Sequence, residues 1–288
     1  MGSAAEFPDP GLDAVDADFE DATVGMRSPH ESGEIEIGAI LAPDPLSRRP
    51  EYGHLPRLPR LPRLSVLIPA LNEEGGVRQV LREIPHNSLR RMGFNVAIQL
   101  LDGGSSDRTR EYARERGAGV YVQKGWGKGT AFREFLPTLK SDYCVILDSD
   151  ATYPPQRIPT FAKALREGAP VVLGSRFKGK IHDGAMTAPN KLGNLILSRF
   201  ASILYRRNVS DVCSGMWGFR TEILKSFAIS ADGFDLEANL FAECVRRGLP
   251  IIEVPIPYYR RIGSPKLRLR TGLRIAWALL RNRIRLPD

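Results

Sequence analysis

The sequence predicts a doubly wound α/β fold with a mainly parallel central sheet flanked by helices. Short apolar runs that suit buried strands alternate with segments of helical apolar spacing, and this alternation begins near Leu64. Polar or glycine-containing turns follow the strands. The carboxyl ends of parallel strands meet at one edge of a sheet. We therefore expect one domain whose binding loops gather at that edge.

The expected elements follow from the apolar pattern in chain order. The strands are expected at 64–70, 95–101, 119–123, 143–147 and 170–173, with 250–259 as an edge strand because of its prolines. The helices are expected at 74–84, 106–116, 129–139, 156–167, 190–205 and 234–247. Residues 211–220 contain glycines and are expected to be irregular.

The charge of the chain is unevenly distributed. Its net charge is +8, but Met1 to Glu36 contains ten acidic residues and one base, so the remainder carries about +17. A basic body suits a phosphorylated substrate or an anionic membrane surface. Neither zinc-ligand spacing nor an aromatic-rich nucleic-acid motif accompanies the charge, so we expect no nucleic-acid partner.

Four regions are expected along the chain. They are a disordered acidic tail at 1–54, a Leu-Pro-Arg polyproline II linker at 55–63, the α/β domain at 64–266 and a basic amphipathic helix at 267–288. The start of the chain lacks the pattern of a signal peptide, and no apolar run is long enough for a membrane span. We expect a cytoplasmic protein.

The stretch 143–155 carries the strongest chemical signal. An apolar strand ends in Asp148 and Asp150, and residues two apart in an extended segment point the same way. Two carboxylates suit a hard divalent cation, Mg²⁺ or Mn²⁺. As an isolated pattern, the same residues are also typical of an ordinary turn.

Three further turns carry candidate residues. After the first strand, Glu73 is either a ligand contact or a helix cap. Asp102 ends the second strand, where the following glycines let the backbone approach a flat ring or ribose. After the third strand, Gly127 and Lys128 open a helix in a pattern that suits a diphosphate but lacks Walker spacing.

The ordered set of motifs resembles one family. IPALNEE, LDGGSSDRT, GKGTA, DSD with a following PP, GSR, SGMWGFR and RIGSPKL resemble family 2 glycosyltransferases of the GT-A fold, which is Rossmann-like. The resemblance is greatest to polyprenyl-phosphate (dolichol-phosphate type) mannosyl- and glucosyltransferases, and it covers Leu64 to about Arg268.

The resemblance implies donor-side roles for one group of residues. Contacts to the nucleotide sugar are implied for Pro69, Leu71, Glu73, Asp102, Gly127, Lys128 and Asp148. Asp148 and Asp150 would also hold Mg²⁺ or Mn²⁺ on the diphosphate.

A second group receives acceptor-side or catalytic roles from the same resemblance. Arg220, Arg261 and Lys266 would bind the acceptor phosphate, and the catalytic residues would be Asp150, Arg176 and Glu237. A polyprenyl phosphate is anionic and attacks without a strong general base. Glu237 is thus a base, a ligand of a sugar hydroxyl or simply an exposed helix carboxylate.

Two positions depart from the family pattern. Gly103 replaces the second carboxylate that is common after the second strand, and Thr152 stands where the mannose synthases often have Gln. GDP-mannose, UDP-glucose and UDP-N-acetylhexosamine therefore all remain open as donors.

The C-terminal helix has an apolar stripe and an adjoining basic one. The apolar residues are Leu269, Leu273, Trp277, Leu280 and Ile284, and the bases are Arg270, Arg274, Arg281 and Arg285. Such a helix can lie on an anionic bilayer, or it can dock its stripe on the domain.

We expect metal-dependent, inverting transfer of a hexose from a nucleotide sugar to polyprenyl phosphate, by an enzyme on the inner face of the cytoplasmic membrane. Two alternatives stay open. One is a family 2 enzyme with a soluble acceptor, such as a glucosyl-3-phosphoglycerate synthase. The other is a non-catalytic nucleotide-sugar sensor or membrane adaptor.

Overall fold

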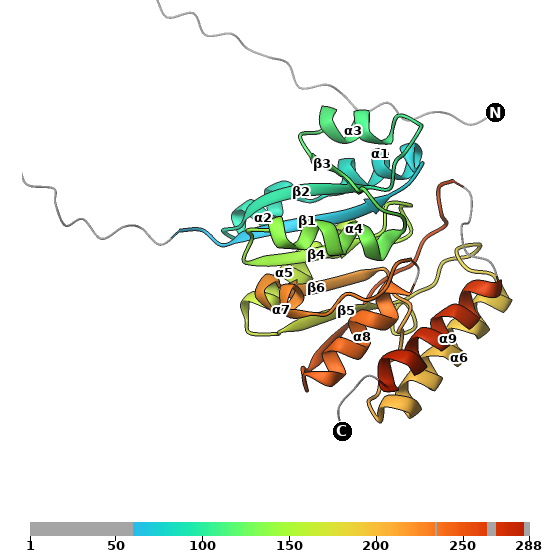
Figure 1. Cartoon of the computed structure of the whole chain (residues 1–288). Coiled ribbons are helices and arrows are strands. Elements are labelled where there is room, and N and C mark those ends of the chain that lie inside the picture. The colour runs from blue at the N-terminus through green and yellow to red at the C-terminus, as the bar shows by residue number, and fades with distance from the viewer. Residues whose placement is uncertain (1–59, 234, 264–268, 285–288) are drawn as a thin grey trace, which may run out of the picture. The chain divides into compact units, whose positions relative to one another are not determined.

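Seven strands form one sheet in residues 60–233, 235–263 and 269–284, which are the residues that the computed structural model describes (Figure 1). The strands are β1 (Arg63–Ala70), β2 (Asn95–Asp102), β3 (Gly119–Val122), β4 (Tyr143–Leu147), β5 (Val171–Ser175), β6 (Met216–Arg220) and β7 (Ile251–Pro255). Their order is β3-β2-β1-β4-β6-β5-β7. All neighbours are parallel except β6, which is antiparallel to β4 and β5. The predicted mainly parallel α/β fold is confirmed.

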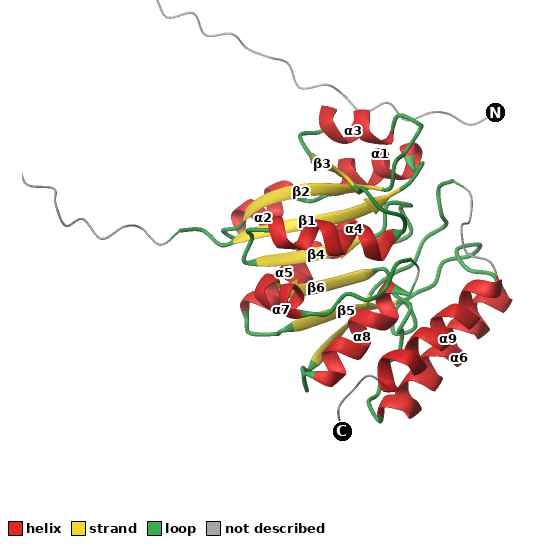
Figure 2. Ribbon diagram, in the orientation of Figure 1, coloured by secondary structure: helices red, strands yellow, loops and turns green. Residues whose placement is uncertain are grey.

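Nine α-helices are present among the described residues (Figure 2). They are α1 (Glu74–Glu83), α2 (His86–Arg91), α3 (Thr109–Glu115), α4 (Lys128–Phe135), α5 (Ile158–Arg166), α6 (Ala188–Tyr205), α7 (Thr221–Ser226), α8 (Leu236–Arg246) and α9 (Leu269–Ile284). Two short 3₁₀ helices, η1 (Leu136–Thr138) and η2 (Pro155–Arg157), extend α4 and precede α5. Within the described part of the chain, none of these helices has the length and apolar character that a membrane crossing requires.

Alternation along the strands creates two apolar cores, one on each face of the sheet. On β1, Val66 and Ile68 face one core, whereas Leu67 between them faces the other. The first core includes residues of α1, α2, α3 and α5, and the second includes residues of α4, α6, α8 and α9. The helices therefore cover both faces and leave the carboxyl ends of β1, β2 and β4 at an edge.

The expectation of an irregular segment at 211–220 was wrong in part. Residues 216–220 form β6, which is inserted between β4 and β5 and carries the fully buried Trp217 and Phe219. Gly218 fits closely there, because a Cβ would lie 3.0 Å from the Phe161 ring and 3.3 Å from Leu165, so a larger residue would require both to shift. The glycine that suggested a loop in the sequence is thus a packing requirement in a central strand.

The C-terminal helix α9 docks on the domain through one of its faces. Ile275, Ala278 and Leu279 are buried in the core that α6 and α8 also line. The Tyr205 hydroxyl of α6 donates a hydrogen bond to the Leu279 carbonyl at 2.8 Å. Docking, one of the two alternatives for this helix, is therefore realised, but by residues other than the predicted stripe. Leu273, Trp277 and Ile284 of that stripe remain exposed.

Close backbone contact between α1 and the turn after β4 generates a prediction on glycine substitution. A Cβ on Gly76 would lie 2.3 Å from the Ser149 carbonyl oxygen, whereas a Cβ on Gly193 in α6 meets no atom within 4 Å. Gly76→Ala should lower the free energy of unfolding by about 2 kcal/mol, because α1 or the turn must move. Gly193→Ala should raise it by up to about 1 kcal/mol through helix propensity. Urea unfolding measures both, and equal effects of the two substitutions would contradict this packing account.

Candidate active site

The predicted carboxylates meet at the carboxyl edge of the parallel strands. Ala70 at the end of β1 pairs with Asp102 at the end of β2, and Asp148 directly follows β4 on the other side of β1. Lys128 and Glu237, from the first turns of α4 and α8, and Arg261, after β7, also reach this edge. Residues from six separate parts of the chain thus form one polar site.

Lys128 bridges two carboxylates from different elements. Its Nζ lies 2.6 Å from Asp148 Oδ1 and 2.5 Å from Glu237 Oε1. Burial alone would lower the pKa of Lys128, but the charges of Asp148 and Glu237 outweigh it and hold the pKa above its ordinary value. Lys128 is therefore a permanent cation at neutral pH, and Glu237, whose side chain is 12% exposed, is an ion-pair partner rather than an exposed helix carboxylate.

Arg261 forms a second bridge on the neighbouring side of the site. Its Nη2 donates to Glu73 Oε1 at 2.6 Å, and its Nη1 lies 3.2 Å from Asp150 Oδ2. The other oxygen of Asp150 accepts hydrogen bonds from the Thr152 hydroxyl at 2.6 Å and the Thr152 amide at 3.1 Å. Burial, followed by the charge of Asp148, raises the pKa of Asp150 above its usual range.

Asp102 presents a polar atom to which no described residue donates a hydrogen bond. It is fully buried, and its Oδ2 accepts the amides of Gly104 and Ser105, each at 3.0 Å. Its Oδ1 is buried and has no hydrogen-bond partner among the described residues. A buried acceptor without a hydrogen bond destabilises the folded protein unless a ligand donates a hydrogen bond to it.

The first turn lies beside Asp102. Pro69 is half-buried at the end of β1, and the side chain of Leu71 is 38% exposed. The Gly103 amide donates to the Ala70 carbonyl, and a Cβ on Gly103 would lie 3.2 Å from Leu71 Cβ. Gly103 therefore lets the first and second turns approach each other.

The glycines around Lys128 serve packing in this structure. Gly127 has a φ of 89°, and a Cβ there would lie 2.0 Å from the Asp232 carbonyl oxygen. A Cβ on Gly129 would lie 2.2 Å from the Ala231 carbonyl oxygen. The two glycines thus press the start of α4 against the segment before α8, which brings Lys128 to Glu237.

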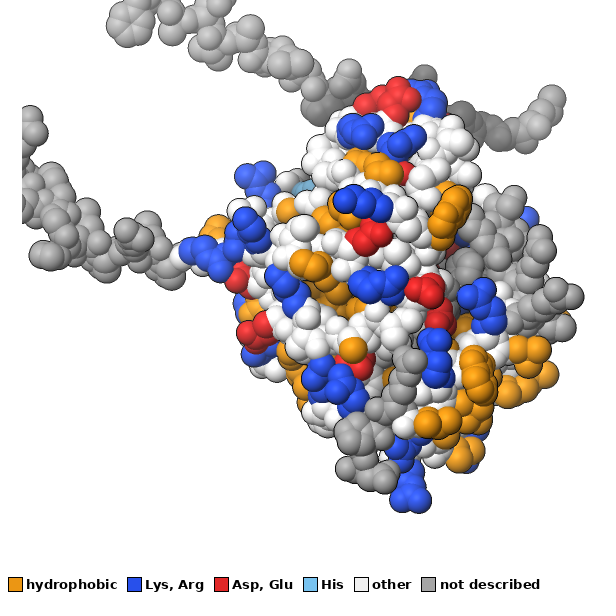
Figure 3. Space-filling view, viewed as in Figure 1, with side chains coloured by type: hydrophobic (Ala, Val, Ile, Leu, Met, Phe, Trp, Pro, Cys, Tyr) orange, Lys and Arg blue, Asp and Glu red, His pale blue; other side chains and the backbone are white. Residues whose placement is uncertain are grey.

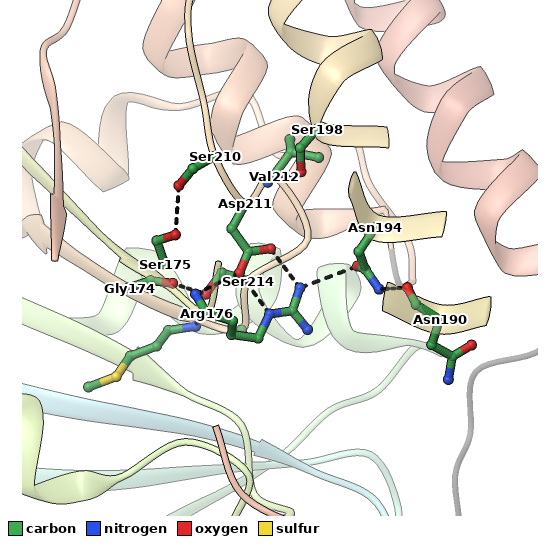
Figure 4. Close-up of polar contacts among 12 residues, drawn as sticks. Gly174, Ser175, Arg176, Asn190, Asn194, Ser198, Ser210, Asp211, Val212 and Ser214 are labelled. Carbon is green, nitrogen blue, oxygen red and sulfur yellow. Dashed lines mark hydrogen bonds and ion pairs between the residues drawn. The ribbon is translucent and has the colours of Figure 1, made fainter. Parts of the chain in front are cut away.

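Arg176 is held by the protein in a network that the sequence did not predict (Figure 4). Its Nε and Nη2 bond the two oxygens of Asp211 at 2.7 and 2.6 Å, and Nη2 also donates to Asn194 Oδ1 at 3.2 Å. Burial would lower the pKa of Arg176, but the charge of Asp211 raises it well above its ordinary value. No local pattern marks Asp211 or Asn194 as its partners.

The prediction that Arg220 binds an acceptor phosphate was wrong. In the antiparallel register, Arg220 pairs with Tyr143 at the start of β4, while Met216 pairs with Leu147 at its end. Arg220 therefore lies roughly 16 Å along the strand from Asp148, toward the opposite edge of the sheet. The other predicted acceptor-side residue, Lys266, lies outside the described residues.

Asp148 and Asp150 are the donor set that fits a divalent cation. No group of three or more His, Cys, Asp or Glu side chains with metal-binding geometry occurs among the described residues. Two adjacent carboxylates that offer only anionic oxygens suit Mg²⁺ or Mn²⁺, provided that a ligand and water complete the coordination. In this structure Lys128 and Arg261 neutralise the two aspartates, which is the role that a divalent cation would also serve.

A family comparison bears directly on this site. The model of Glycosyl transferase family 2 matches residues 65–227, which is more than half of the chain. The chain belongs to this family. The match spans β1 to α7 and includes the turns that carry Glu73, Asp102, Lys128 and the two aspartates.

Two family relatives from Haloferax volcanii are similar to the chain. Glycosyltransferase AglJ is 35% identical over 197 residues, covering 68% of this chain and 63% of AglJ. The dolichyl-phosphate hexose transferase is 35% identical over 206 residues, covering 71% of this chain and 86% of that protein. The chain therefore spans less than two thirds of AglJ but most of the second relative.

A solved structure is similar to this family 2 chain in fold. The crystal structure of glucosyl-3-phosphoglycerate synthase from Mycobacterium tuberculosis, in complex with Mn²⁺, UDP and glucosyl-3-phosphoglycerate, has a TM-score of 0.62 and 25% identity. The similarity covers 79% of this chain and 81% of that one. The predicted GT-A type of fold is thereby confirmed.

The bridging role of Lys128 generates a testable prediction. Lys128→Met leaves Asp148 and Glu237 without a shared counter-charge, so the free energy of unfolding in a chelator should fall by about 3 kcal/mol. Adding Mn²⁺ should then stabilise the variant more than the wild type, because the cation replaces the missing charge. Urea unfolding with and without Mn²⁺ measures both effects.

The exposed Lys124 in the loop before α4 supplies the matched control. Lys124→Met should change neither the stability nor the response to Mn²⁺. An equal response to Mn²⁺ in Lys128→Met and in wild type would contradict the bridging role.

Proposed function

We propose that this protein transfers a hexose from a nucleotide sugar to a polyprenyl phosphate in a metal-dependent reaction. The observation that carries the proposal is the cluster at the sheet edge, where Asp148 and Asp150 alternate with the cations of Lys128 and Arg261. Family membership and the likeness to a dolichyl-phosphate hexose transferase support the reaction class.

The nucleoside is assigned to the first two turns. Asp102 Oδ1 is a buried acceptor without a partner among the described residues, so it suits an N–H of a base or a hydroxyl of a ribose. Pro69 and Leu71 offer apolar surface beside it, and Gly103 keeps the two turns close. Either UDP or GDP carries the required donors.

The diphosphate is assigned to the edge of β4. Asp148 and Asp150 would hold Mg²⁺ or Mn²⁺, which neutralises charge on the diphosphate as the sugar leaves. The likeness to a synthase structure that contains Mn²⁺ and UDP supports this cofactor. Lys128 would supply a point charge and Arg261 a planar fork to the phosphate oxygens, and both already lie beside the carboxylates.

The acceptor side requires binding rather than strong base catalysis. A polyprenyl phosphate already carries the anionic oxygen that attacks the sugar. Glu237 bonds Lys128 at 2.5 Å, so we assign it to positioning Lys128, with a sugar hydroxyl as its second contact. Arg176 binds Asp211, and the following Gly215 lies against the Asp148 side chain, so Arg176 is next to the site; its phosphate contact remains a prediction.

The proposed acceptor also implies a cellular location and a role for each region of the chain. A polyprenyl phosphate acceptor requires an enzyme at a membrane surface, so we place the protein on the inner face of the cytoplasmic membrane. The residues around 64–266 would then be the catalytic domain, with the acidic tail and the Leu-Pro-Arg linker preceding it. The tail and most of the linker lie outside the described residues.

A soluble acceptor is the second candidate. The likeness in fold to glucosyl-3-phosphoglycerate synthase, at 25% identity, favours a small phosphorylated acid in place of the lipid. Both candidates share the donor site and the cation, so the phase into which the product partitions separates them.

The test is an incubation with labelled UDP- and GDP-hexoses, polyprenyl phosphate and Mn²⁺, followed by organic extraction. Wild-type protein should place label in the organic phase. Asp150→Asn should lower the rate by about 10³-fold because a cation ligand is lost. Asp183→Asn, at an exposed carboxylate, should have no effect.

A labelled aqueous product that is chromatographically distinct from the donor and its free sugar, formed only when 3-phosphoglycerate is supplied and with no label in the organic phase, would reject the lipid acceptor and favour the second candidate. Absence of product with every donor would reject both transferase assignments. Full transfer by Asp150→Asn would instead reject the assignment of the cation site.

A further inference from the structure

Helices α6 and α9 lie side by side at one end of the domain (Figure 1). The inward side of α6 carries Asn194, Ser198, Ala201 and Tyr205, which are spaced by four, three and four residues. Ser198, Ala201 and Tyr205 are buried, and α9 packs against this part of the domain through its own buried residues. The opposite sides of both helices carry exposed side chains.

The outward side of α6 is apolar. Leu192, Leu195, Ile196 and Ile203 are 60%, 41%, 58% and 64% exposed. Their spacing of three, one and seven residues places them on one stripe of the helix. The sequence predicts a helix at 190–205, and the structure shows that this helix has apolar side chains on its outward side as well as its inward side.

The outward side of α9 continues this apolar surface. Leu273, Trp277 and Ile284 are 74%, 63% and 79% exposed, and they advance by four and seven residues. Seven of the thirteen exposed large apolar side chains among the described residues therefore lie on α6 and α9. In the space-filling view, apolar side chains gather over these two helices (Figure 3). We call these seven side chains the α6–α9 face.

The charges carried by these two helices have one sign, although Arg281 of α9 pairs with Asp235, at the start of α8, at 3.7 Å. Neither helix contains an Asp or a Glu in its sequence, whereas α6 contains Lys191 and Arg199 and α9 contains four arginines. Lys191, Arg199 and Arg274 are exposed next to the apolar stripes. A patch of apolar residues and bases without acids is complementary to a surface that is anionic outside and apolar beneath.

We propose that the α6–α9 face seats the protein on an anionic lipid bilayer, with Trp277 at the level of the headgroups. This inference rests on the proposed function in one respect: membrane binding would give the enzyme access to a lipid acceptor. A second copy of the chain fits the face less well, because two such faces would bring the bases of α6 and α9 together, and neither helix carries an acid to pair with them.

The α6–α9 face is connected to the site through the inward side of α6. Asn194 accepts a hydrogen bond from Arg176 Nη2 at 3.2 Å, and Ser198 Oγ accepts one from the Val212 amide at 3.1 Å. Arg176 is in turn paired with Asp211 (Figure 4). A bilayer on the outward side of α6 is thus separated by one helix from the Arg176 network.

The test measures partitioning of the full chain onto vesicles by Trp277 fluorescence, in a Trp126→Phe background because Trp126 is 83% exposed and Trp217 is buried. Vesicles of phosphatidylglycerol should shift the emission to the blue, and phosphatidylcholine alone should not. Leu192→Ser with Ile196→Ser should weaken partitioning at least tenfold. Lys191→Gln should weaken it about fivefold and make it less dependent on salt.

The matched control is Val122→Ser with Ile252→Ser, two apolar residues exposed outside the α6–α9 face. This control should bind vesicles as the wild type does. Equal binding by control and face variants would overturn the proposal. A concentration-dependent dimer in analytical ultracentrifugation that only the face variants lose, with vesicle binding unchanged, would overturn it in favour of a second copy.

Transfer to a short, water-soluble polyprenyl phosphate separates this inference from the proposed function. The face variants should retain that transfer while they lose vesicle binding. Loss of both in a folded variant would assign the face to the catalytic site and overturn the proposal. Vesicle binding by a wild type that transfers to no polyprenyl phosphate would support the face and reject the proposed function.

Discussion

Mutual repulsion among carboxylates is the constraint that organises the carboxyl edge of this sheet. Asp148 and Asp150 lie two residues apart at the end of one strand, and Glu237 reaches the same place from another helix. The protein offsets these charges with Lys128 and Arg261, each of which bridges two carboxylates. A bound cation and diphosphate would form a similar arrangement of alternating charges. The cation could take the place of Lys128 and Arg261 beside the aspartates, and the diphosphate could then pair with these two bases, so no buried charge would be left unpaired.

Much of the surrounding structure supports this exchange. Gly127 and Gly129 allow the start of α4 to press on the segment before α8, which sets the position of Lys128. The segment with Arg261 is tied to the turn after β4, because the Ile262 amide donates to the Asp150 carbonyl at 3.0 Å. Close packing around these residues leaves few ways to move one charge without another, and the site therefore acts as a unit.

The sequence predicted the features that depend on neighbours along the chain. The apolar run before Asp148 predicted β4 with its observed bounds. The bridge from Lys128 to Glu237 joins residues 109 positions apart, and no local pattern encodes it. Arg220 was misassigned because it follows a glycine-containing run that forms an antiparallel strand, whose direction carries the side chain to the far edge. Periodicity thus predicts elements, whereas partners across the fold depend on strand order and direction.

The most direct measurement of the central claim is calorimetric titration of UDP and GDP into the full chain, with Mn²⁺ and with a chelator. If carboxylates and side-chain cations form a site for a cation and a diphosphate, one nucleotide should bind only with Mn²⁺ present. Asp148→Asn should abolish that binding while the fold persists. Nucleotide binding of equal affinity in Mn²⁺ and in chelator, unchanged in Asp148→Asn, would contradict the account.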